Sequence, residues 1–308
     1  MGKYNMITIL GPTASGKTTV AANVAYRMNG EVISADSKQV YRNMNIGTGK
    51  DYDDYSIEGR EVPCHLVDIC EAGEKYSVYR YQEDFLTVYN EIVSRDKLPV
   101  MCGGTGMYIE SILEGYRLIS VPVNYSLRDN LEGKSMEELT NILKTYKELH
   151  NITDITLRET AVRAIEIAKY YSDHNFEEPE FPEINSLVVG IKFDRNSRRK
   201  RISERLRARF EDGMVEEVKS LLESGVSEKT LIYYGLEYKF ITWYLQEKIS
   251  YDEMFSQLET SIHRFAKRQM TWFRRMERKG IIIRWMDGYM PLDEKIKKVN
   301  EWYSGVYK

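Results

Sequence analysis

The chain has 308 residues, 42% of them hydrophobic and 30% charged, with a net charge of −3. This length predicts one large α/β core with a smaller module. No apolar run is long enough to span a membrane. The cysteines have no paired spacing, so a zinc finger is not expected. Reduced thiols in the cytoplasm are expected instead. The three cysteines are Cys64, Cys70 and Cys102.

The charge is distributed unevenly along the chain. Residues 1–180 carry 19 basic and 28 acidic side chains, whereas residues 181–308 carry 25 and 19. The basic excess gathers in two stretches, 198–209 and 264–279. Each stretch is either a solvated helix face or a contact for a polyanion such as RNA, and composition alone leaves both interpretations open.

The N-terminal residues predict the first strand of the fold and not a secretion signal. The run 5–10 is short, apolar and rich in β-branched residues, which is typical of a buried parallel strand. A helix is predicted over 17–29, ending at Gly30, and a second strand over 31–35. Strands that alternate with helices predict a parallel sheet with right-handed crossovers.

A complete G-x-x-x-x-G-K-[ST] phosphate loop (P-loop) lies between that first strand and helix. Its glycines let successive N–H groups point inward, and the helix N-terminus adds to their field. Lys17 supplies a mobile charge, and the Thr18 hydroxyl is a ligand for Mg²⁺. The motif therefore predicts a di- or triphosphate site. It comprises Gly11, Pro12, Thr13, Ala14, Ser15, Gly16, Lys17 and Thr18.

The sequence gives little support to the default ligand of such a loop, ATP. A nucleoside triphosphatase also needs an acidic residue at the end of an apolar strand to hold Mg²⁺. The predicted strand 99–102 ends in glycines, and only Asp68 is a partial candidate. This favours a ligand with a diphosphate and different chemistry beyond it.

Polar residues follow the second predicted strand. Ligands of open α/β sheets bind at the carboxyl ends of strands, so Asp36 is expected across a cleft from the P-loop. Asp36 is either a helix cap or a general base, and Gln39 is able to read an adenine edge through paired hydrogen bonds. The glycine-rich run 103–106 is either a tight turn or a second loop that faces the ligand.

The later elements are predicted mainly from periodicity. Residues 136–149 and 158–171 predict helices of a small helical insert, placed at 121–185 between the two parts of the core, 1–120 and 186–308. Strands are predicted at 187–193 and 281–285. Helices are predicted at 107–113, 203–224, 250–278 and 292–302.

Together these pieces resemble one family, the tRNA dimethylallyltransferases (tRNA isopentenyltransferases), in their bacterial form. The resemblance covers nearly the whole chain, and the order and spacing of the blocks agree. The blocks are 11–18, 36–41, 47–50, 65–68, 76–78, 103–108, 163–166 and 266–274.

The resemblance implies a P-loop fold with a parallel sheet flanked by helices and a small all-helical insert. It implies transfer of a dimethylallyl group from dimethylallyl diphosphate to N6 of adenine 37 in tRNA, with Mg²⁺. Asp36 is then the general base, acting with Lys17 and Thr105, and Arg205 or a neighbouring arginine grips the diphosphate. The expected tRNA contacts are Asp36, Ser37, Lys38, Gln39, Thr105 and Arg128. A cytoplasmic monomer is expected.

The chain departs from the family pattern at several positions. Leu157 and Thr160 stand where the family usually has Asp and Arg. The run Gly235-Leu236-Glu237-Tyr238 replaces a usual Gly-Tyr-Lys-Glu block. These departures bear on tRNA contacts and leave the P-loop and Asp36 intact.

Three other functions compete with this interpretation. A P-loop kinase is disfavoured by the element around Gln39 and by the block 271–273. A prenyltransferase acting on free AMP or ADP would need neither the insert nor the basic C-terminal half. A non-catalytic RNA-binding relative would not need Asp36 and Lys17.

Overall fold

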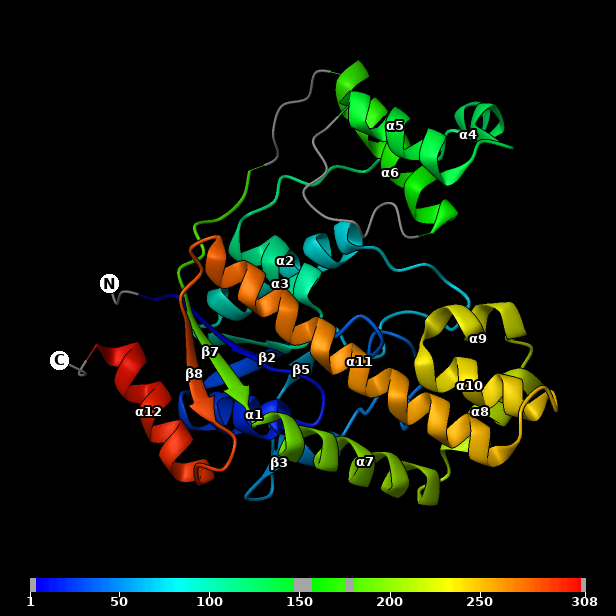
Figure 1. Cartoon of the computed structure of the whole chain (residues 1–308). Helices are drawn as coiled ribbons and strands as arrows, with labels where there is room; N and C mark the ends of the chain where they lie inside the picture. The colour runs from blue at the N-terminus through cyan, green and yellow to red at the C-terminus, as the bar shows by residue number, and fades with distance from the viewer. Residues whose placement is uncertain (1–3, 147–156, 175–179, 306–308) are drawn as a thin grey trace. The chain divides into compact units, whose positions relative to one another are not determined.

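The computed structural model describes residues 4–146, 157–174 and 180–305 of the chain (Figure 1). The chain forms two compact units, one from residues 1–116 and 182–308 and the other from residues 117–181. No helix in the described residues is long and apolar enough to cross a membrane.

The larger unit is built on a parallel sheet of six strands, which confirms the predicted fold class. The strands lie in the order β5-β2-β6-β1-β7-β8, and each pairs in parallel with its neighbours. Their bounds are β1 Met6–Leu10, β2 Gly30–Ala35, β5 Cys64–His65, β6 Leu98–Gly103, β7 Ser186–Lys192 and β8 Ile283–Asp287.

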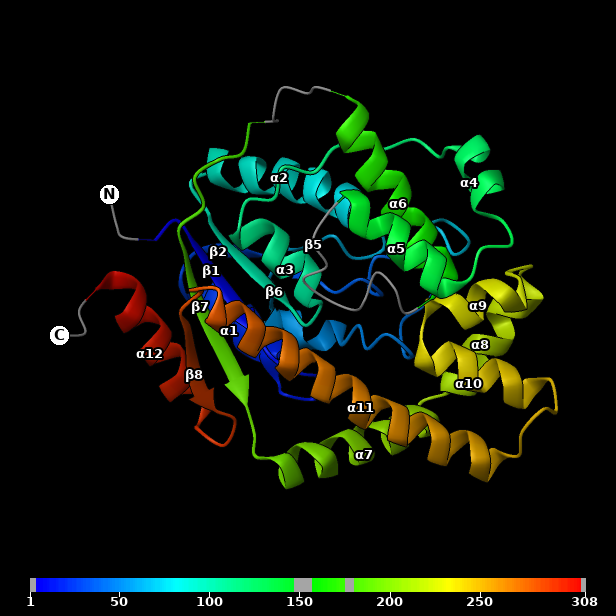
Figure 2. The same ribbon diagram turned by 45° about the horizontal axis from the view of Figure 1, so that its top comes forward.

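Helices cover both faces of this sheet, as Figures 1 and 2 show. Helices α1 (Lys17–Arg27) and α12 (Leu292–Ser304) share one apolar core with alternate side chains of the strands, such as Ile7 and Ile9. On the other face lie α2 (Val78–Ser94) and α3 (Gly106–Leu113), where Tyr81 contacts Met101. A short hairpin, β3 (Ser56–Ile57) and β4 (Arg60–Glu61), follows a 3₁₀ turn at Tyr52–Tyr55.

A group of helices extends the unit beyond the sheet. The predicted helix 203–224 is wrong as one element, because Gly213 adopts a left-handed conformation (φ 95°) that ends one helix and begins the next. The sequence interpretation did not include α2, α9 or α10. The helices of the group are α7 Arg195–Glu211, α8 Met214–Glu223, α9 Glu228–Tyr234, α10 Leu236–Leu245 and α11 Tyr251–Arg278.

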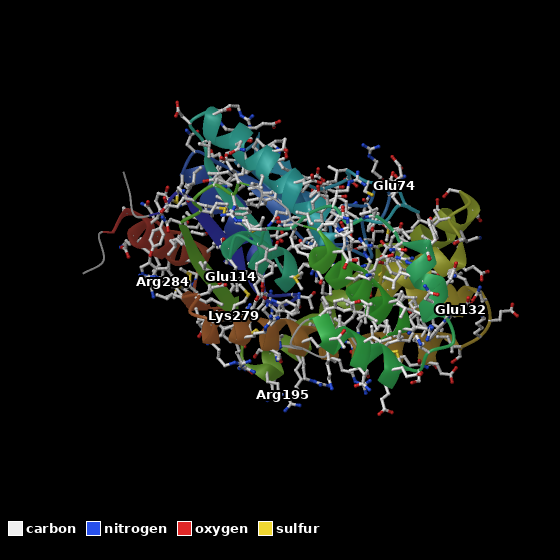
Figure 3. The ribbon with its side chains drawn as sticks, turned by 90° about the horizontal axis from the view of Figure 1, so that it is seen from above. Glu74, Glu114, Glu132, Arg195, Lys279 and Arg284 are labelled. Atoms are coloured by element: carbon white, nitrogen blue, oxygen red, sulfur yellow. The ribbon has the colours of Figure 1, made fainter. Side chains whose placement is uncertain are left out.

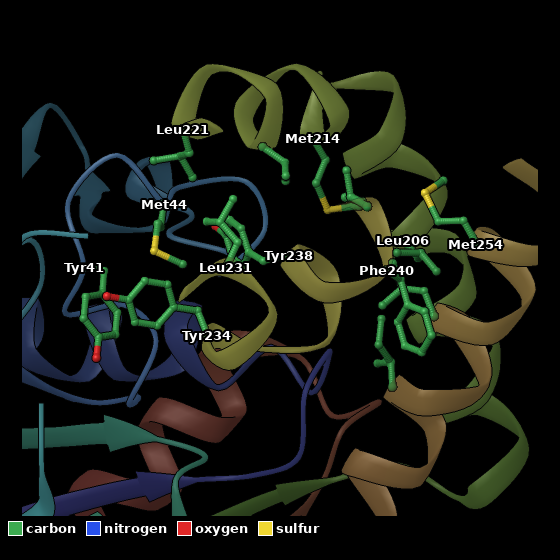
Figure 4. Packing of buried hydrophobic residues seen from close by; sticks show 14 of the residues in the cluster. Tyr41, Met44, Leu206, Met214, Leu221, Leu231, Tyr234, Tyr238, Phe240 and Met254 are labelled. Atoms are coloured by element: carbon green, nitrogen blue, oxygen red, sulfur yellow. The ribbon is translucent and has the colours of Figure 1, made fainter. Parts of the chain in front are cut away.

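Aromatic and methionine side chains fill the interior of this helical group (Figure 4). Tyr41 and Met44, from the segment after β2, pack there with Tyr234 and Tyr238 of α9 and α10. The segment after β2 is therefore attached to the helical group as well as to the sheet.

The smaller unit consists of α4 (Tyr125–Leu131), α5 (Met136–Tyr146) and α6 (Arg158–Asp173). Its apolar core includes Leu139, Leu143 and Ile165. The predicted helix 136–149 runs at its end into residues outside those described. The departure at Leu157 places an exposed leucine immediately before α6.

One carboxylate holds the loop that joins the sheet to the helical group. Glu217, in the first turn of α8, accepts hydrogen bonds from the backbone N–H groups of Asn45 and Ile46, both at 2.7 Å, and of Gly47 at 3.0 Å. It also accepts from the Tyr238 hydroxyl at 2.8 Å. Hydrogen bonds to an ionised group are the stronger ones, so Glu217 fixes this loop.

We expect Glu217→Gln to lower the free energy of unfolding by about 1–3 kcal/mol. The amide has one acceptor atom in place of two, and its NH₂ group would face backbone donors. Urea denaturation measures the change, with Glu216→Gln, an exposed neighbour on α8, as the control. Equal stability of the two variants would contradict the role of Glu217.

Candidate active site

The P-loop follows β1 and curls by two left-handed residues. Ala14 has φ 60° and Gly16 has φ 74°, and α1 begins at the next residue, Lys17. A Cβ on Gly11 would lie 2.6 Å from the Ser15 hydroxyl and 2.7 Å from the Ile191 carbonyl, so only glycine fits there. The backbone N–H groups of the loop are thus arranged around a site for an anion.

Lys17 lies at the bottom of the loop. Burial lowers the pKa of its ammonium group, and the nearby Cys102 and Asp36 partly offset this effect. α1 has no acidic residue in its first turn to neutralise the helix N-terminus. A phosphate ligand would supply the negative charge that the N-terminus of α1 favours.

Asp36 lies directly after β2, where the sequence predicted a residue facing the P-loop. One of its carboxylate oxygens accepts a hydrogen bond from the Lys38 N–H at 3.0 Å, which holds the side chain in one orientation. No other hydrogen bond to this carboxylate comes from the described residues. Residues 37–40 form a turn and not a helix, so this bond stabilises a turn and the alternative of a helix cap is wrong. The role of Asp36 as a base stays a prediction.

Thr105 connects the ends of β2 and β6. Its hydroxyl oxygen accepts from the Ser37 N–H at 3.0 Å and donates to the Ser37 hydroxyl at 3.4 Å. Its own N–H donates to the Ala35 carbonyl at 3.1 Å. Thr105 thus positions the segment that carries Asp36.

Gln39 lies in the cleft, with both ends of its amide engaged. The oxygen accepts from the Ser34 hydroxyl at 3.0 Å, and the nitrogen donates to the Gly49 carbonyl at 3.0 Å. An amide has two N–H groups and two lone pairs, so one donor and one acceptor remain for a ligand. The paired contact to an adenine edge stays a prediction.

One cleft of the larger unit brings most of the predicted site residues together. Three residues of the P-loop line this cleft: Thr13, Lys17 and Thr18. The outer side of the loop, residues 14–19, borders a second hollow, which Arg201 and Arg205 also line. The other predicted residues in the cleft are Asp36, Ser37, Lys38, Gln39, Thr105 and Arg205.

The cleft also contains functional groups that the sequence interpretation did not assign. Gln269 of α11 accepts from the Thr13 N–H at 2.9 Å and donates to the Gly104 carbonyl at 3.0 Å, which ties the P-loop to the glycine-rich loop after β6. In the sequence, only the family block 266–274 points to a role for Gln269, because its partners Thr13 and Gly104 lie far away along the chain. Arg209 and Glu237 line the same cleft.

Asp68 is not available as the metal-binding acid of a nucleotide triphosphatase. Its carboxylate accepts from the Lys50 ammonium and from the Tyr52 hydroxyl. The Lys50 side chain is almost completely buried, which makes this a structural ion pair. β6 ends in Gly103, as predicted.

Arg128 belongs to the smaller unit, where its guanidinium binds the buried Glu166. Arg128 Nε donates to one carboxylate oxygen at 3.0 Å and Nη2 to the other at 2.9 Å. Glu166 also accepts from Arg163 and from the Asn124 N–H at 2.6 Å. Burial by itself would raise the pKa of the Glu166 carboxyl group. These hydrogen bonds, above all those from Arg128, outweigh burial, so the pKa is lowered. Arg128 has a structural partner, and its contact with tRNA stays a prediction.

A large basic groove of 720 Å³ lies between α7 and α11, beside the ends of β7 and β8. Two acidic residues line it, Asp194, whose side chain caps α7, and Glu277, which binds Trp285. Arg195 begins α7 on this side (Figure 3). None of the seven lysines and arginines of the groove has an ion pair with the described residues. They are Lys192, Arg195, Arg198, Arg199, Arg264, Lys267 and Arg274.

The sheet, the P-loop and the facing carboxylate define a phosphate-loop protein with a second reactive group in its cleft. The chain belongs to the IPP transferase family, whose model matches residues 39–276. A second model, of isopentenyl transferase, matches residues 4–60.

Relatives agree over nearly the full length. The chain is 57% identical over 301 residues to tRNA dimethylallyltransferase 2 of Bacteroides fragilis, covering 98% of each chain. It is 55% identical over 299 residues to the protein of the same name from Phocaeicola vulgatus, covering 97% of each. These matches confirm the family resemblance.

Solved structures share the fold. A tRNA isopentenylpyrophosphate transferase from Bacillus halodurans is 29% identical, with a TM-score of 0.70 over 98% of this chain and 96% of that one. A eukaryotic dimethylallyltransferase acting on tRNA has a TM-score of 0.77 over 97% of this chain and 79% of that one. At 20% identity, the second likeness concerns the fold alone.

We expect Gln269→Leu to weaken the binding of inorganic pyrophosphate about tenfold, because the Thr13 N–H and the Gly104 carbonyl lose their partners and the P-loop loosens. Gln269→Glu keeps the acceptor for Thr13 and should lose less. Calorimetry measures both, with Gln257→Leu on the exposed side of α11 as the control. If the control loses as much affinity as Gln269→Leu, the bridge is not what orders the loop.

Proposed function

We propose that this chain transfers the dimethylallyl group of dimethylallyl diphosphate to N6 of adenine 37 in tRNA and releases diphosphate. The observation that carries the proposal is the presence of Lys17 and Asp36 in one cleft, in a chain of the IPP transferase family. The names of the relatives support tRNA as the acceptor.

The donor end is suited to a leaving diphosphate. An allylic C–O bond breaks readily because the cation is delocalised, so the barrier lies in the negative charge that grows on the diphosphate. Backbone N–H groups, Lys17 and Arg205 are in place before that charge develops, and such preorganised groups stabilise it strongly.

Mg²⁺ fits this end as a partner of the donor. The described residues hold no cluster of three metal-binding side chains. Thr18 lies at the end of the loop with Asp51 and Asp54 around the outer hollow. Mg²⁺ commonly binds through substrate phosphates, waters and one or two protein groups, so Thr18 would be its protein ligand and the metal would neutralise phosphate charge.

The acceptor end is suited to an amine that is a poor nucleophile. The lone pair of the adenine N6 is conjugated with its ring, so removal of a proton helps as the C–N bond forms. Asp36 offers one carboxylate oxygen for this, while Lys38 holds the other. The base must leave its stack to enter the cleft, where Ser37, Lys38, Gln39 and Thr105 line the walls.

One further feature supports this function over ATP hydrolysis. Asp68 is bound by Lys50 and Tyr52 and so cannot serve as the acid of a nucleoside triphosphatase. A tRNA substrate supports a cytoplasmic location.

Radiolabelled dimethylallyl diphosphate tests the proposal directly. The protein is incubated with the donor, Mg²⁺ and total bacterial tRNA, and in parallel with AMP as the acceptor. Label in tRNA is expected. Label only in AMP would assign the enzyme to free nucleotides, and label in neither would overturn the proposal.

We expect Asp36→Asn to reduce kcat by about 10²–10⁴-fold with little change in tRNA affinity. Asparagine still accepts from the Lys38 N–H, so the local structure is kept while the base is lost. Single-turnover rates and filter binding measure the two effects, with Asp53→Asn, an exposed neighbour, as the control. A parallel loss of tRNA binding would make Asp36 structural.

The basic groove supplies phosphate contacts for the RNA. We expect the double variant Arg264→Glu, Lys267→Glu to weaken tRNA binding and to flatten the dependence of log Kd on log salt by about 0.7–0.9 for each lost contact. Dimethylallyl diphosphate binding should stay unchanged. The matched control is Lys229→Glu, Lys248→Glu, both exposed and outside the groove; the same salt dependence in both doubles would exclude the groove as a phosphate contact.

A further inference from the structure

Two arginines of α7 reach into the cleft from consecutive turns. Arg205 and Arg209 both line it, and both lie against Gly49. A Cβ at Gly49 would overlap Arg209 Nη2 and lie 2.8 Å from Arg205 Nη2. Gly49 has φ 69°, so the loop that Glu217 holds is shaped around the two guanidinium groups.

The two arginines differ in their partners. Arg205 forms an ion pair with Asp51. Arg209 Nη2 is buried and has no hydrogen-bond partner among the described residues. An unsatisfied buried donor on a charged group is costly, so this nitrogen marks a position for a ligand atom.

The surroundings of Arg209 support an anionic ligand. Burial lowers the pKa of its guanidinium to about 10, and the positive charge of Arg205 contributes to the shift. Glu237 and Asp51 act in the opposite direction. Glu237 is itself buried, and burial raises the pKa of its carboxyl group. Two guanidinium groups kept side by side in a buried cleft repel each other, and an anion between them removes that repulsion.

Arg205 is already part of the function proposed above. We propose that Arg209 supplies a second guanidinium to the same diphosphate, so that the two arginines form a clamp on the leaving group. The proposal rests on the function proposed above. The C–O bond between the allyl carbon and the α-phosphate breaks, and its electron pair stays on the diphosphate. N6 of adenine supplies the pair for the new C–N bond, and Asp36 takes its proton.

The clamp also explains how a cation is tolerated in this part of the cleft. A free guanidinium next to the developing allyl cation would raise the barrier, whereas one bound to phosphate oxygens stabilises the charge that the same step creates.

Calorimetry with inorganic pyrophosphate and Mg²⁺ on the full chain tests the clamp. We expect R209M to bind pyrophosphate about 10- to 100-fold more weakly, because a hydrogen bond between charged groups is lost. Methionine is of similar length and leaves the pocket filled. R209K keeps the charge with a different donor geometry and should lie between the wild type and R209M.

Two controls make the result specific. Arg207 lies on the same helix, is exposed and stacks on Phe255 outside the cleft, so R207M should bind pyrophosphate like the wild type. Thermal melting checks that R209M is folded, and R209K decides the test if it is not.

The outcomes separate the clamp from the proposed function. Unchanged pyrophosphate binding in R209M or R209K, together with normal dimethylallyl transfer in the wild type, overturns the clamp and leaves the function intact. Loss of tRNA affinity in R209M, with pyrophosphate affinity unchanged, assigns Arg209 to an RNA phosphate or base and also overturns it. Weaker pyrophosphate binding with no labelling of tRNA by the wild type supports the clamp and refutes the function.

Discussion

The site depends on the register of three parallel strands. Gly103, the last residue of β6, pairs with Leu10 of β1 on one side and with Ala35 of β2 on the other. The P-loop, the loop after β6 and the Asp36 segment therefore begin side by side. A Cβ on Gly103 would collide with the Ala35 carbonyl, so glycine is required for this pairing. Neighbouring strands lie about 4.8 Å apart, which separates the starts of the P-loop and the Asp36 segment by about 10 Å. That gap leaves room for the donor and the acceptor amine to meet at one allylic carbon, where the C–O bond breaks and the C–N bond forms.

Strand register alone does not hold these three loops rigid, because each loop leaves the sheet directly after the end of its strand. Gln269 of α11 bonds the P-loop to the Gly104 loop, Thr105 bonds the Gly104 loop to Ser37, and Glu217 of α8 holds the segment 45–47. Each bond crosses between elements that are far apart in the chain. The helical group thus does more than enlarge the core, because it fixes the relative positions of donor and acceptor groups. Such preorganisation lets charges stabilise a transition state without rearranging first.

The sequence predicted what is encoded locally. The P-loop, the strands β1, β2, β6 and β7, and the position of Asp36 follow from short patterns in which neighbouring residues determine the structure. The missed features depend on partners remote in sequence. Gln269 meets Thr13 across 256 residues, and the block 266–274 marks its segment without indicating this contact. The same holds for Glu217 and the loop 45–47. The break at Gly213 was missed because apolar periodicity continues through it, although its glycine was a visible signal.

The arginines of α7 divide between the site around the P-loop and the basic groove. Arg201, Arg205 and Arg209 recur every four residues and face the P-loop and the cleft, where Arg201 Nε donates to the Ala14 carbonyl at 3.0 Å. Arg195, Arg198 and Arg199, at the start of the helix, line the basic groove. Composition describes all of them as a single basic stretch. Position along the helix divides them, because the arginines of the groove all lie in the first five residues of α7 and those of the P-loop and the cleft follow them. A compact diphosphate and an extended RNA backbone can therefore be bound at the same time without competing for the same charges.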